Sequence, residues 1–234
     1  MKLTIIIPVF NEDKTVSEII RRVKKVKLAK GVTKEIIVVD DGSTDKSPKM
    51  IAKIKKIKFY RHAVNKGKGA AIRTGLSKAT GDIILIQDAD LEYNPRYYPK
   101  LLKTILEGKS KVVYGTRLKN YPLRLLGAKK TPLITHYLGN KFLSLVTNVL
   151  YGNRLSDMET CYKVFLRECV ETIKLNANRF EFEPEITAKI LKRGYKITEV
   201  PIRIRPRGYD QGKKITWKDG FIALWTLIKY RFVD

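Results

Sequence analysis

The chain has 234 residues, of which 44% are hydrophobic and 15 are glycine, so it can bury the core of one large α/β domain. Its formal net charge of +25 favours an anionic partner, such as a phosphorylated substrate, an acidic membrane surface or a nucleic acid. A thermophilic surface rich in ion pairs is the alternative explanation of that charge. Two cysteines, Cys161 and Cys169, exclude a disulfide framework and a four-cysteine zinc site, and we expect reduced thiols.

No secretory or membrane-spanning segment is predicted. Residues 3–10 run directly into Asn-Glu-Asp and are typical of a strand, not of a signal peptide. The longest apolar stretches, 131–151 and 221–233, are interrupted by Lys, His, Asn and Arg and are too short to span a bilayer. We expect a cytoplasmic protein, peripheral on the inner face of the cell membrane if it meets lipid at all.

The first half of the chain alternates strand and helix patterns. Strands are predicted at 3–9, 35–39, 58–61, 82–86 and 111–114, with helices near 14–27, 46–55, 67–78 and 96–106. Such alternation predicts right-handed βαβ units and a mostly parallel central sheet flanked by helices. Near-continuous apolar strands, such as residues 4–7, are typical of strands buried on both faces.

After residue 115 the alternation weakens, and residues 121–130 are predicted to form a basic loop. Two later segments, 134–150 and 216–232, have apolar residues at helical spacing. Most faces of this kind are ordinary core. The alternative is an interfacial helix against a bilayer, which Trp217, Trp225 and the flanking Lys218, Lys229 and Arg231 favour.

Three polar clusters follow predicted strands. Residues 8–12 (PVFNE) end the first strand, 40–45 (DDGSTD) end the second, and Asp88-Ala89-Asp90 end the fourth. The carboxyl ends of parallel strands meet at one edge of a sheet, where open α/β sheets bind ligands. An isolated Asp-x-Asp is more often a turn, but in this combination Asp88 and Asp90 are candidate oxygen ligands for a divalent cation.

These motifs, together with Asn65-Lys66-Gly67-Lys68-Gly69, resemble those of the family 2 glycosyltransferases of GT-A (Rossmann-like) fold. The run Asp157-Met158-Glu159-Thr160-Cys161-Tyr162-Lys163 and the arginines after residue 202 are similar to the branch that makes polyprenyl-phosphate sugars, typified by dolichol-phosphate mannose synthase. The resemblance covers about residues 3–220. It implies a single domain over 1–234, with a nucleotide-sugar half at 1–117 and an acceptor half at 118–234.

The resemblance also implies roles for particular residues. A nucleotide-sugar donor, GDP- or UDP-linked, is expected to contact Pro8, Phe10, Asn11, Glu12, Asp40, Gly67, Gly69, Asp88 and Ala89. Asp88 and Asp90, joined by Glu92, are expected to hold Mg²⁺ or Mn²⁺ on the donor diphosphate. The missing side chains of Gly67 and Gly69 let the backbone approach the nucleotide.

Basic residues of the second half are expected to bind phosphate. Arg203, Arg205 and Arg207 alternate with isoleucines, which on a strand would put three guanidiniums on one face; a solvated edge strand is the alternative. The phosphate and acceptor contacts expected are Arg117, Arg179, Arg203, Arg205, Lys213 and Lys214, and the catalytic residues expected are Asp90, Asp157 and Arg205.

The function implied is metal-dependent, inverting transfer of a hexose, mannose or glucose, to a polyprenyl phosphate at a membrane. An anionic lipid phosphate needs no base, whereas a saccharide hydroxyl, the alternative acceptor, needs one, and Asp157 and Glu159 are the candidates. A nucleic-acid-binding module is a distant alternative, because no helix-turn-helix, zinc or RNA-recognition motif is present, and we expect no nucleic-acid partner.

Overall fold

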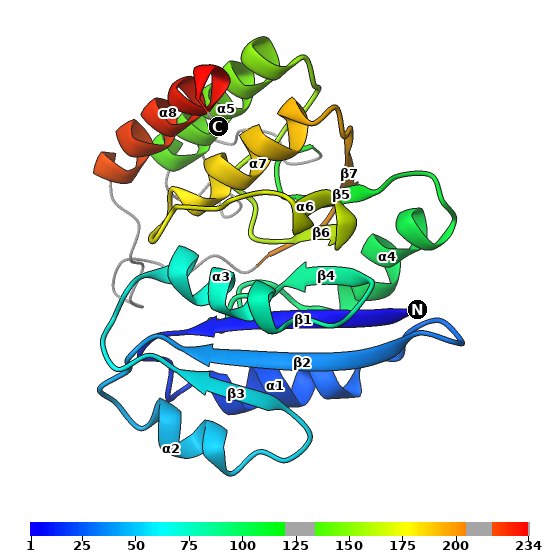
Figure 1. Cartoon of the computed structure of the whole chain (residues 1–234), viewed down its shortest axis with the longest axis vertical. Coiled ribbons are helices and arrows are strands. Elements are labelled where there is room, and N and C mark those ends of the chain that lie inside the picture. Colours follow the sequence, from blue (N-terminus) through cyan, green and yellow to red (C-terminus); the bar gives the residue numbers. More distant parts are fainter. Residues whose placement is uncertain (120–133, 205–216, 234) are drawn as a thin grey trace, which may run out of the picture.

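The computed structural model describes residues 1–119, 134–204 and 217–233. Seven strands in these ranges form one sheet, in the order β3-β2-β1-β4-β6-β5-β7 (Figure 1). Their bounds are β1 Lys2–Val9, β2 Thr33–Asp40, β3 Lys58–Arg61, β4 Ile83–Ile86, β5 Val112–Thr116, β6 Lys163–Leu166 and β7 Ile197–Pro201. The predicted strands of the first half are therefore confirmed.

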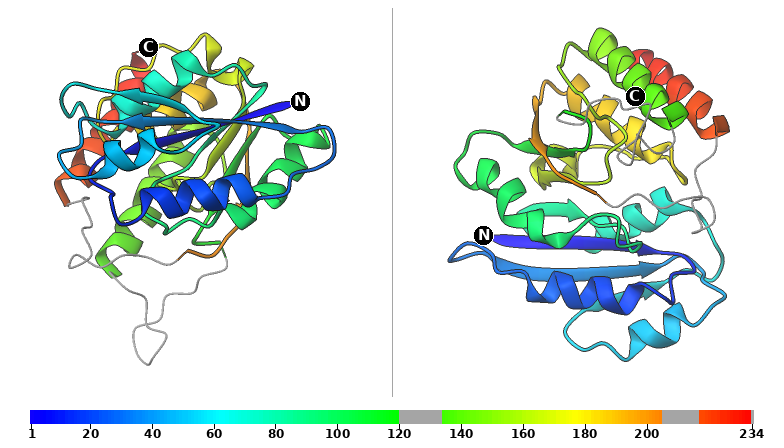
Figure 2. Two further views of the ribbon diagram at one scale, coloured as in Figure 1. Left: turned by 90° about the horizontal axis from the view of Figure 1, so that it is seen from below. Right: turned by 180° about the vertical axis from the view of Figure 1, so that it is seen from behind.

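Helices connect the strands and cover both faces of the sheet (Figure 2). Their bounds are α1 Val16–Lys25, α2 Ser47–Ala52, α3 Lys68–Lys78, the 3₁₀ helix η1 Pro95–Tyr97, α4 Tyr98–Leu106, α5 Ile134–Tyr151, α6 Glu168–Glu171, α7 Phe182–Lys192 and α8 Trp217–Phe232. Among the described residues, no helix is long and apolar enough to cross a membrane.

The sheet is mostly parallel, as predicted, and β6 is its reversed strand. β1 pairs in parallel with β2 and β4, β2 with β3, and β5 with β7, whereas β6 runs antiparallel to β4 and β5. Because β6 is reversed, the residues just before it lie at the edge where β4 and β5 end. Residues 157–162 therefore join the strand-end motifs of the first half.

The core lies on both faces of the sheet, because successive side chains of a strand point to opposite faces. Ile5 and Ile7 of β1 pack with α1 and α4, whereas Ile6 packs with α3, α7 and α8. All three side chains are fully buried. Burying each contributes about 1.5–3 kcal/mol, which explains why the strands read as continuous apolar runs.

The elements after residue 150 were less visible in the sequence. β6, α6, α7 and β7 were not predicted, and β6 has four residues beginning with the fully buried Lys163. The expected arginine strand is wrong for the described part: β7 ends at Pro201, and Arg203 follows it. The ladder stops there because its partner β5 ends at Thr116, whose carbonyl accepts the last bond, from the Ile202 N–H.

Candidate active site

Polar side chains from several strand ends and loops meet at the carboxyl edge of the sheet. Asp40 is the last residue of β2 and is fully buried. Arg61 Nε donates to its Oδ2 at 3.0 Å, while Oδ1 is buried and has no hydrogen-bond partner in the described chain. A buried carboxylate oxygen without a donor is costly, so this atom marks a place where a ligand N–H or O–H can bind.

The turns after β1 and β2 are tied together by Asn11 and Glu12. Asn11 has a positive φ of 52°, and its Oδ1 accepts the Thr44 N–H at 2.9 Å. The Glu12 N–H donates to Ser47 Oγ at 2.9 Å, and Glu12 Oε2 accepts from Thr15 Oγ at 2.7 Å. Pro8 and Phe10, beside them, are half-buried. The expected nucleotide residues of the first turn are thus brought beside Asp40.

Asp41 lies at the same edge of the sheet as the candidate site, and the sequence analysis did not single it out. Its carboxylate accepts the backbone N–H groups of Lys66 and Gly67 at 3.0 and 2.7 Å, and Asn65 Nδ2 at 3.0 Å. His62 Nδ1 lies 2.7 Å from Asp41 Oδ1, the oxygen that also accepts the Lys66 N–H. Asp41 therefore fixes the loop between β3 and α3, and an Asp pair preceding Gly-Ser-Thr was the available signal.

Gly67 and Gly69 are required by close backbone packing in the described chain, and their role toward the nucleotide stays a prediction. Gly67 has a φ of +100°, and a Cβ there would collide with the Asn178 carbonyl. A Cβ at Gly69 would lie 2.6 Å from the Ala177 carbonyl oxygen. Both glycines therefore let the backbone of residues 177–179 approach α3 closely. The Asn178 carbonyl also accepts a hydrogen bond from the Ala70 N–H.

Asp88, two residues beyond β4, is paired with Lys68 of α3. Lys68 Nζ lies 2.9 Å from Asp88 Oδ1, 3.0 Å from Glu183 Oε1 and 3.5 Å from Cys161 Sγ. Burial raises the pKa of Asp88, but the Lys68 ammonium outweighs it and holds that pKa below the ordinary value. The site already contains a cation between acids at the place where a divalent ion was expected.

A divalent ion fits the donor set of this edge only in part. Within the described residues no three His, Cys, Asp or Glu side chains converge as a metal site, so the expected trio of Asp88, Asp90 and Glu92 does not form a complete shell. Asp90 Oδ1 instead accepts the Glu92 N–H at 3.0 Å. Two carboxylates with the remaining oxygens from phosphate and water suit Mg²⁺ or Mn²⁺. The left-handed Leu91, with a φ of 65°, shapes this turn.

A buried chain of charges continues from Lys68 into α7 and β6. Glu183 lies between Lys68 and the fully buried Lys163, whose Nζ donates to Glu183 Oε2 and to the Thr160 carbonyl at 2.6 Å. None of these three residues was among the predicted site residues, although Lys68 and Lys163 lie in the quoted motifs. This chain of ion pairs holds the residues before β6 close to Asp88.

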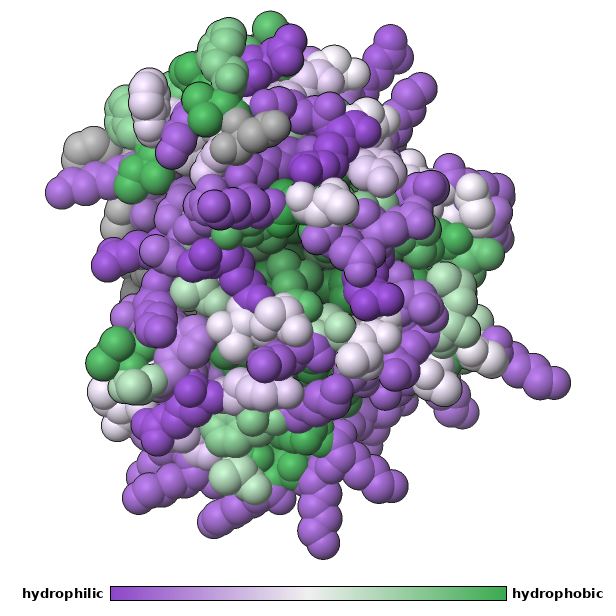
Figure 3. All heavy atoms as spheres, viewed as in Figure 1, coloured by the Kyte–Doolittle hydropathy of each residue, from purple (hydrophilic) through white to green (hydrophobic). Residues whose placement is uncertain are grey.

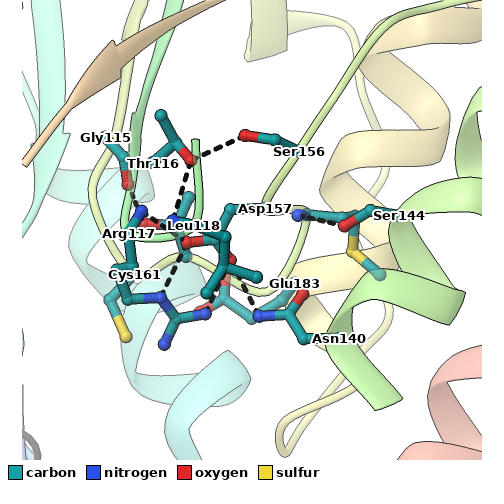
Figure 4. Close-up of polar contacts among 12 residues, drawn as sticks. Gly115, Thr116, Arg117, Leu118, Asn140, Ser144, Ser156, Asp157, Cys161 and Glu183 are labelled. Carbon is teal, nitrogen blue, oxygen red and sulfur yellow. Dashed lines mark hydrogen bonds and ion pairs between the residues drawn. The ribbon is translucent and has the colours of Figure 1, made fainter. Parts of the chain in front are cut away.

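Arg117, just after β5, is held by Asp157 in a bidentate ion pair (Figure 4). Arg117 Nε and Nη2 each lie 2.7 Å from an Asp157 oxygen, and the Arg117 N–H donates to the same carboxylate at 2.8 Å. Asn140 Nδ2 of α5 adds a fourth bond at 2.8 Å. Asp157 is fully buried, and although burial raises its pKa, the Arg117 guanidinium holds that pKa below the ordinary value.

Asp157 and Glu159 have opposite environments. The four hydrogen bonds to Asp157 occupy both of its oxygens, which makes it a holder of Arg117 and a poor proton acceptor. Burial raises the pKa of Glu159 to about 7, and its Oε1 is buried with no hydrogen-bond partner in the described part of the chain. Of the two expected base candidates, Glu159 has the environment of a base.

The remaining predicted phosphate contacts are scattered. Arg203 is exposed, and it lines a cavity of about 440 Å³ together with Glu92 and Leu91. Arg179 is exposed beside Gly67, and no ion pair involving it is found among the described residues. Arg205, Arg207, Lys213 and Lys214 lie outside the described residues, as does the expected basic loop at 121–130.

The chain is similar to known proteins over most of its length. The Glycosyl transferase family 2 profile matches residues 4–174. A dolichol-phosphate mannosyltransferase of Pyrococcus furiosus is 29% identical over 98% of this chain and 64% of its own length, so this chain spans under two thirds of that relative. A Methanococcus voltae UDP-N-acetylglucosamine–dolichyl-phosphate N-acetylglucosaminyltransferase is 28% identical over 96% of this chain and 94% of its own.

Solved structures share the fold. Glucosyl-3-phosphoglycerate synthase of Mycobacterium tuberculosis, in complex with Mn²⁺, UDP-glucose and phosphoglyceric acid, superposes with a TM-score of 0.71 at 20% identity, over all of this chain and 80% of that one. The order of strands and this likeness thus define a GT-A fold. The chain belongs to glycosyltransferase family 2.

Proposed function

We propose that this protein is a metal-dependent, inverting glycosyltransferase that moves a hexose from a GDP- or UDP-linked donor to a polyprenyl phosphate at the cytoplasmic face of a membrane. The observation that carries the acceptor is the Arg117 guanidinium, held by Asp157, whose Oδ1 also accepts a hydrogen bond from Asn140. Relatives named for dolichyl-phosphate transfer support the same acceptor class.

The donor half of the proposal rests on Asp40 and Asp88. Asp40 Oδ1, buried without a partner in the described chain, accepts an N–H of the base or a ribose hydroxyl. Asp88 and Asp90 would hold Mg²⁺ or Mn²⁺, which when bound would neutralise the charge of the leaving diphosphate. Lys68, which lies 3.0 Å from Glu183, would keep that partner and would add a positive charge beside the donor phosphate.

The acceptor half needs orientation more than proton transfer. A lipid phosphate is anionic near neutral pH, so its oxygen attacks the anomeric carbon directly and inverts that centre. Asp157 uses Nε–H and one Nη2–H of Arg117, and a guanidinium has five N–H donors. Among the described residues the other three have no hydrogen-bond partner, and they would bind the acceptor phosphate. The buried pair keeps Arg117 charged and fixed in direction.

The test is product formation from GDP-mannose, UDP-glucose and UDP-N-acetylglucosamine with a polyprenyl phosphate, with Mn²⁺ or with EDTA. We expect a lipid-linked sugar of inverted configuration that EDTA abolishes. Asp88→Asn should remove it, whereas Asp82→Asn, an exposed acid at the opposite end of β4, should not. The absence of a lipid-linked sugar with all three donors would contradict the proposal.

Glu159 favours a second candidate, transfer to a saccharide hydroxyl. A carboxyl group with a pKa of about 7 and a buried oxygen without a described partner suits deprotonation of a hydroxyl. Glu159→Gln separates the two functions. A base should cost roughly two to four orders of magnitude in turnover, whereas transfer to a lipid phosphate should be nearly unchanged.

A further inference from the structure

Two helices of the second half have apolar side chains on their outer as well as their inner sides. α8 buries Ala223, Leu227 and Tyr230 against the core, and α5 buries Leu143. On their outer sides these helices, with Val233 directly after α8, expose ten of the twelve large hydrophobic side chains that are exposed in the described chain. This apolar platform consists of Leu138, Phe142, Leu145, Val149, Phe221, Ile222, Trp225, Ile228, Phe232 and Val233.

The exposed side chains of the platform follow the spacing of a helix and are not scattered over the surface. Leu138, Phe142, Leu145 and Val149 are spaced as one stripe of α5, and α8 repeats the pattern. The two helices lie side by side (Figures 1 and 2), joined by a hydrogen bond of 2.6 Å from Tyr151 Oη to the Leu227 carbonyl. Figure 3 shows hydrophobic side chains gathered at the upper left, where Figure 1 places α8.

The charges of these helices are of one sign. α5 contains no acidic residue, and α8 contains only Asp219. Their basic residues are Lys141, Lys218, Lys229 and Arg231, all exposed or half-buried. A second copy of this chain, with the same basic residues and a net charge of +25, would be repelled. An anionic surface with an apolar interior complements both properties.

We propose that the apolar platform docks onto an anionic lipid bilayer, with the stripes of α5 and α8 at the boundary between head groups and acyl chains. The exposure of single side chains is large: 59% for Leu145, 65% for Trp225 and 80% for Phe232. Removing such apolar area from water favours insertion, and each nearby Lys or Arg adds electrostatic attraction to anionic lipid.

Docking would place the candidate acceptor site close to the lipid. Asn140, which donates to Asp157, lies between Leu138 and Phe142 in the same helix. One α-helix, about 10–12 Å across, therefore separates the Arg117–Asp157 pair from the docked surface. The inference deepens the proposed function, because a polyprenyl phosphate resides in such a bilayer.

The test is sedimentation of the full chain with vesicles of phosphatidylcholine and phosphatidylglycerol in equal parts, and with phosphatidylcholine alone. We expect binding to the anionic vesicles that weakens with salt. Leu145→Glu/Trp225→Glu should lower the partition coefficient at least tenfold. Val64→Glu/Ser77→Glu adds the same charge at exposed positions outside the platform, including an exposed valine, and should bind as the parent does.

A second readout makes folding failures visible. The chain has two tryptophans, so Trp217→Phe leaves Trp225 as the single reporter, and its emission should shift to the blue on adding anionic vesicles. Unchanged circular dichroism and thermal unfolding identify variants that are folded. Leu145, Trp225, Val64 and Ser77 are exposed, so we expect the four glutamate substitutions to leave the fold intact.

Three outcomes overturn the inference. They are a parent that ignores anionic vesicles at low salt, a Leu145→Glu/Trp225→Glu variant that binds as tightly as the parent, and a parent dimer that this variant converts to monomer with no vesicle binding. The last outcome would assign the platform to a second copy. Because no donor or acceptor is used, this test can fail while the proposed glycosyl transfer succeeds, and the reverse also holds.

Discussion

Lys68 is the residue whose position most changes the picture of the donor site. Its ammonium lies within 3.0 Å of both Asp88 and Glu183, so the acids are neutralised before any ligand arrives. At an effective dielectric of about 20, a charge some 4–5 Å away changes the binding energy of a cation by several kcal/mol before screening. Lys68 therefore competes with a divalent ion for the same carboxylate.

Replacing Lys68 by Met should strengthen Mn²⁺ binding to the ligand-free protein about tenfold or more, because a neighbouring positive charge is removed. The same change should lower the free energy of unfolding, since Asp88 and Glu183 lose their counter-charge. Free Mn²⁺ is measured by electron paramagnetic resonance. Lys66→Met, at an exposed neighbouring position, is the control, and equal Mn²⁺ affinity in both variants would contradict the competition.

Asp157→Asn should act through Arg117. The substitution removes the Asp157 carboxylate, which accepts four hydrogen bonds, so the free energy of unfolding should fall by about 3 kcal/mol. Transfer to the acceptor should weaken mainly in KM, because the guanidinium loses its fixed direction. Rates at several pH values decide the role: a pH profile of unchanged shape supports positioning, whereas loss of an essential basic limb supports a proton acceptor.

Glu159→Gln should change the dependence of stability on pH. The folded-state pKa of Glu159, about 7, lies above the ordinary value of 4.5. Its contribution is therefore fully present below about pH 4.5 and is lost as pH rises to about 7. The free energy of unfolding of the Gln variant minus that of the parent should therefore be larger at pH 8 than at pH 4, by roughly 1–3 kcal/mol. Chemical denaturation at both pH values measures this, and parallel profiles for variant and parent would contradict it.

At the scale of elements, the close approach of α3 and the 177–179 loop depends on glycine. Gly69→Ala would put a Cβ 2.6 Å from a backbone carbonyl, so we expect a loss of about 2 kcal/mol or more. Gly139→Ala in α5 meets no atom within 4 Å and should stabilise by about 0.5–1 kcal/mol. Thermal unfolding compares the pair, and similar effects of both substitutions would rule out the collision.

The elements also show what the sequence could and could not predict. β1 to β5 and the acids after β2 and β4 were visible because an apolar strand followed by Asp and Gly is a local signal. β6 was not, since a four-residue strand that begins with Lys163 looks like a surface segment until Glu183 supplies its partner. The use of Asp157 as the anchor of Arg117 is a contact between positions 40 apart, which no local pattern encodes.

At the scale of the whole molecule, binding of the donor should stabilise the fold. A ligand at 100 times its Kd adds about 2.7 kcal/mol to the free energy of unfolding, which is about 5–10 °C in Tm for a chain of this size. We expect this shift for UDP or GDP with Mn²⁺ and a smaller one with EDTA. Asp40→Ala should remove it, and a panel without any nucleotide-dependent shift would contradict the donor site.

Because β6 is reversed, the two halves of the candidate site come from different segments of the chain. Asp40 and Asp88, which we propose to bind the donor, come from the ends of β2 and β4. The residues around Arg117 come from the end of β5, the segment before β6 and α5. Under the proposed function, exchange of residues 117–162 would change acceptor preference while the first hundred residues stay as they are. A chimera that receives this segment from a relative with another acceptor should keep its nucleotide and change the molecule it glycosylates.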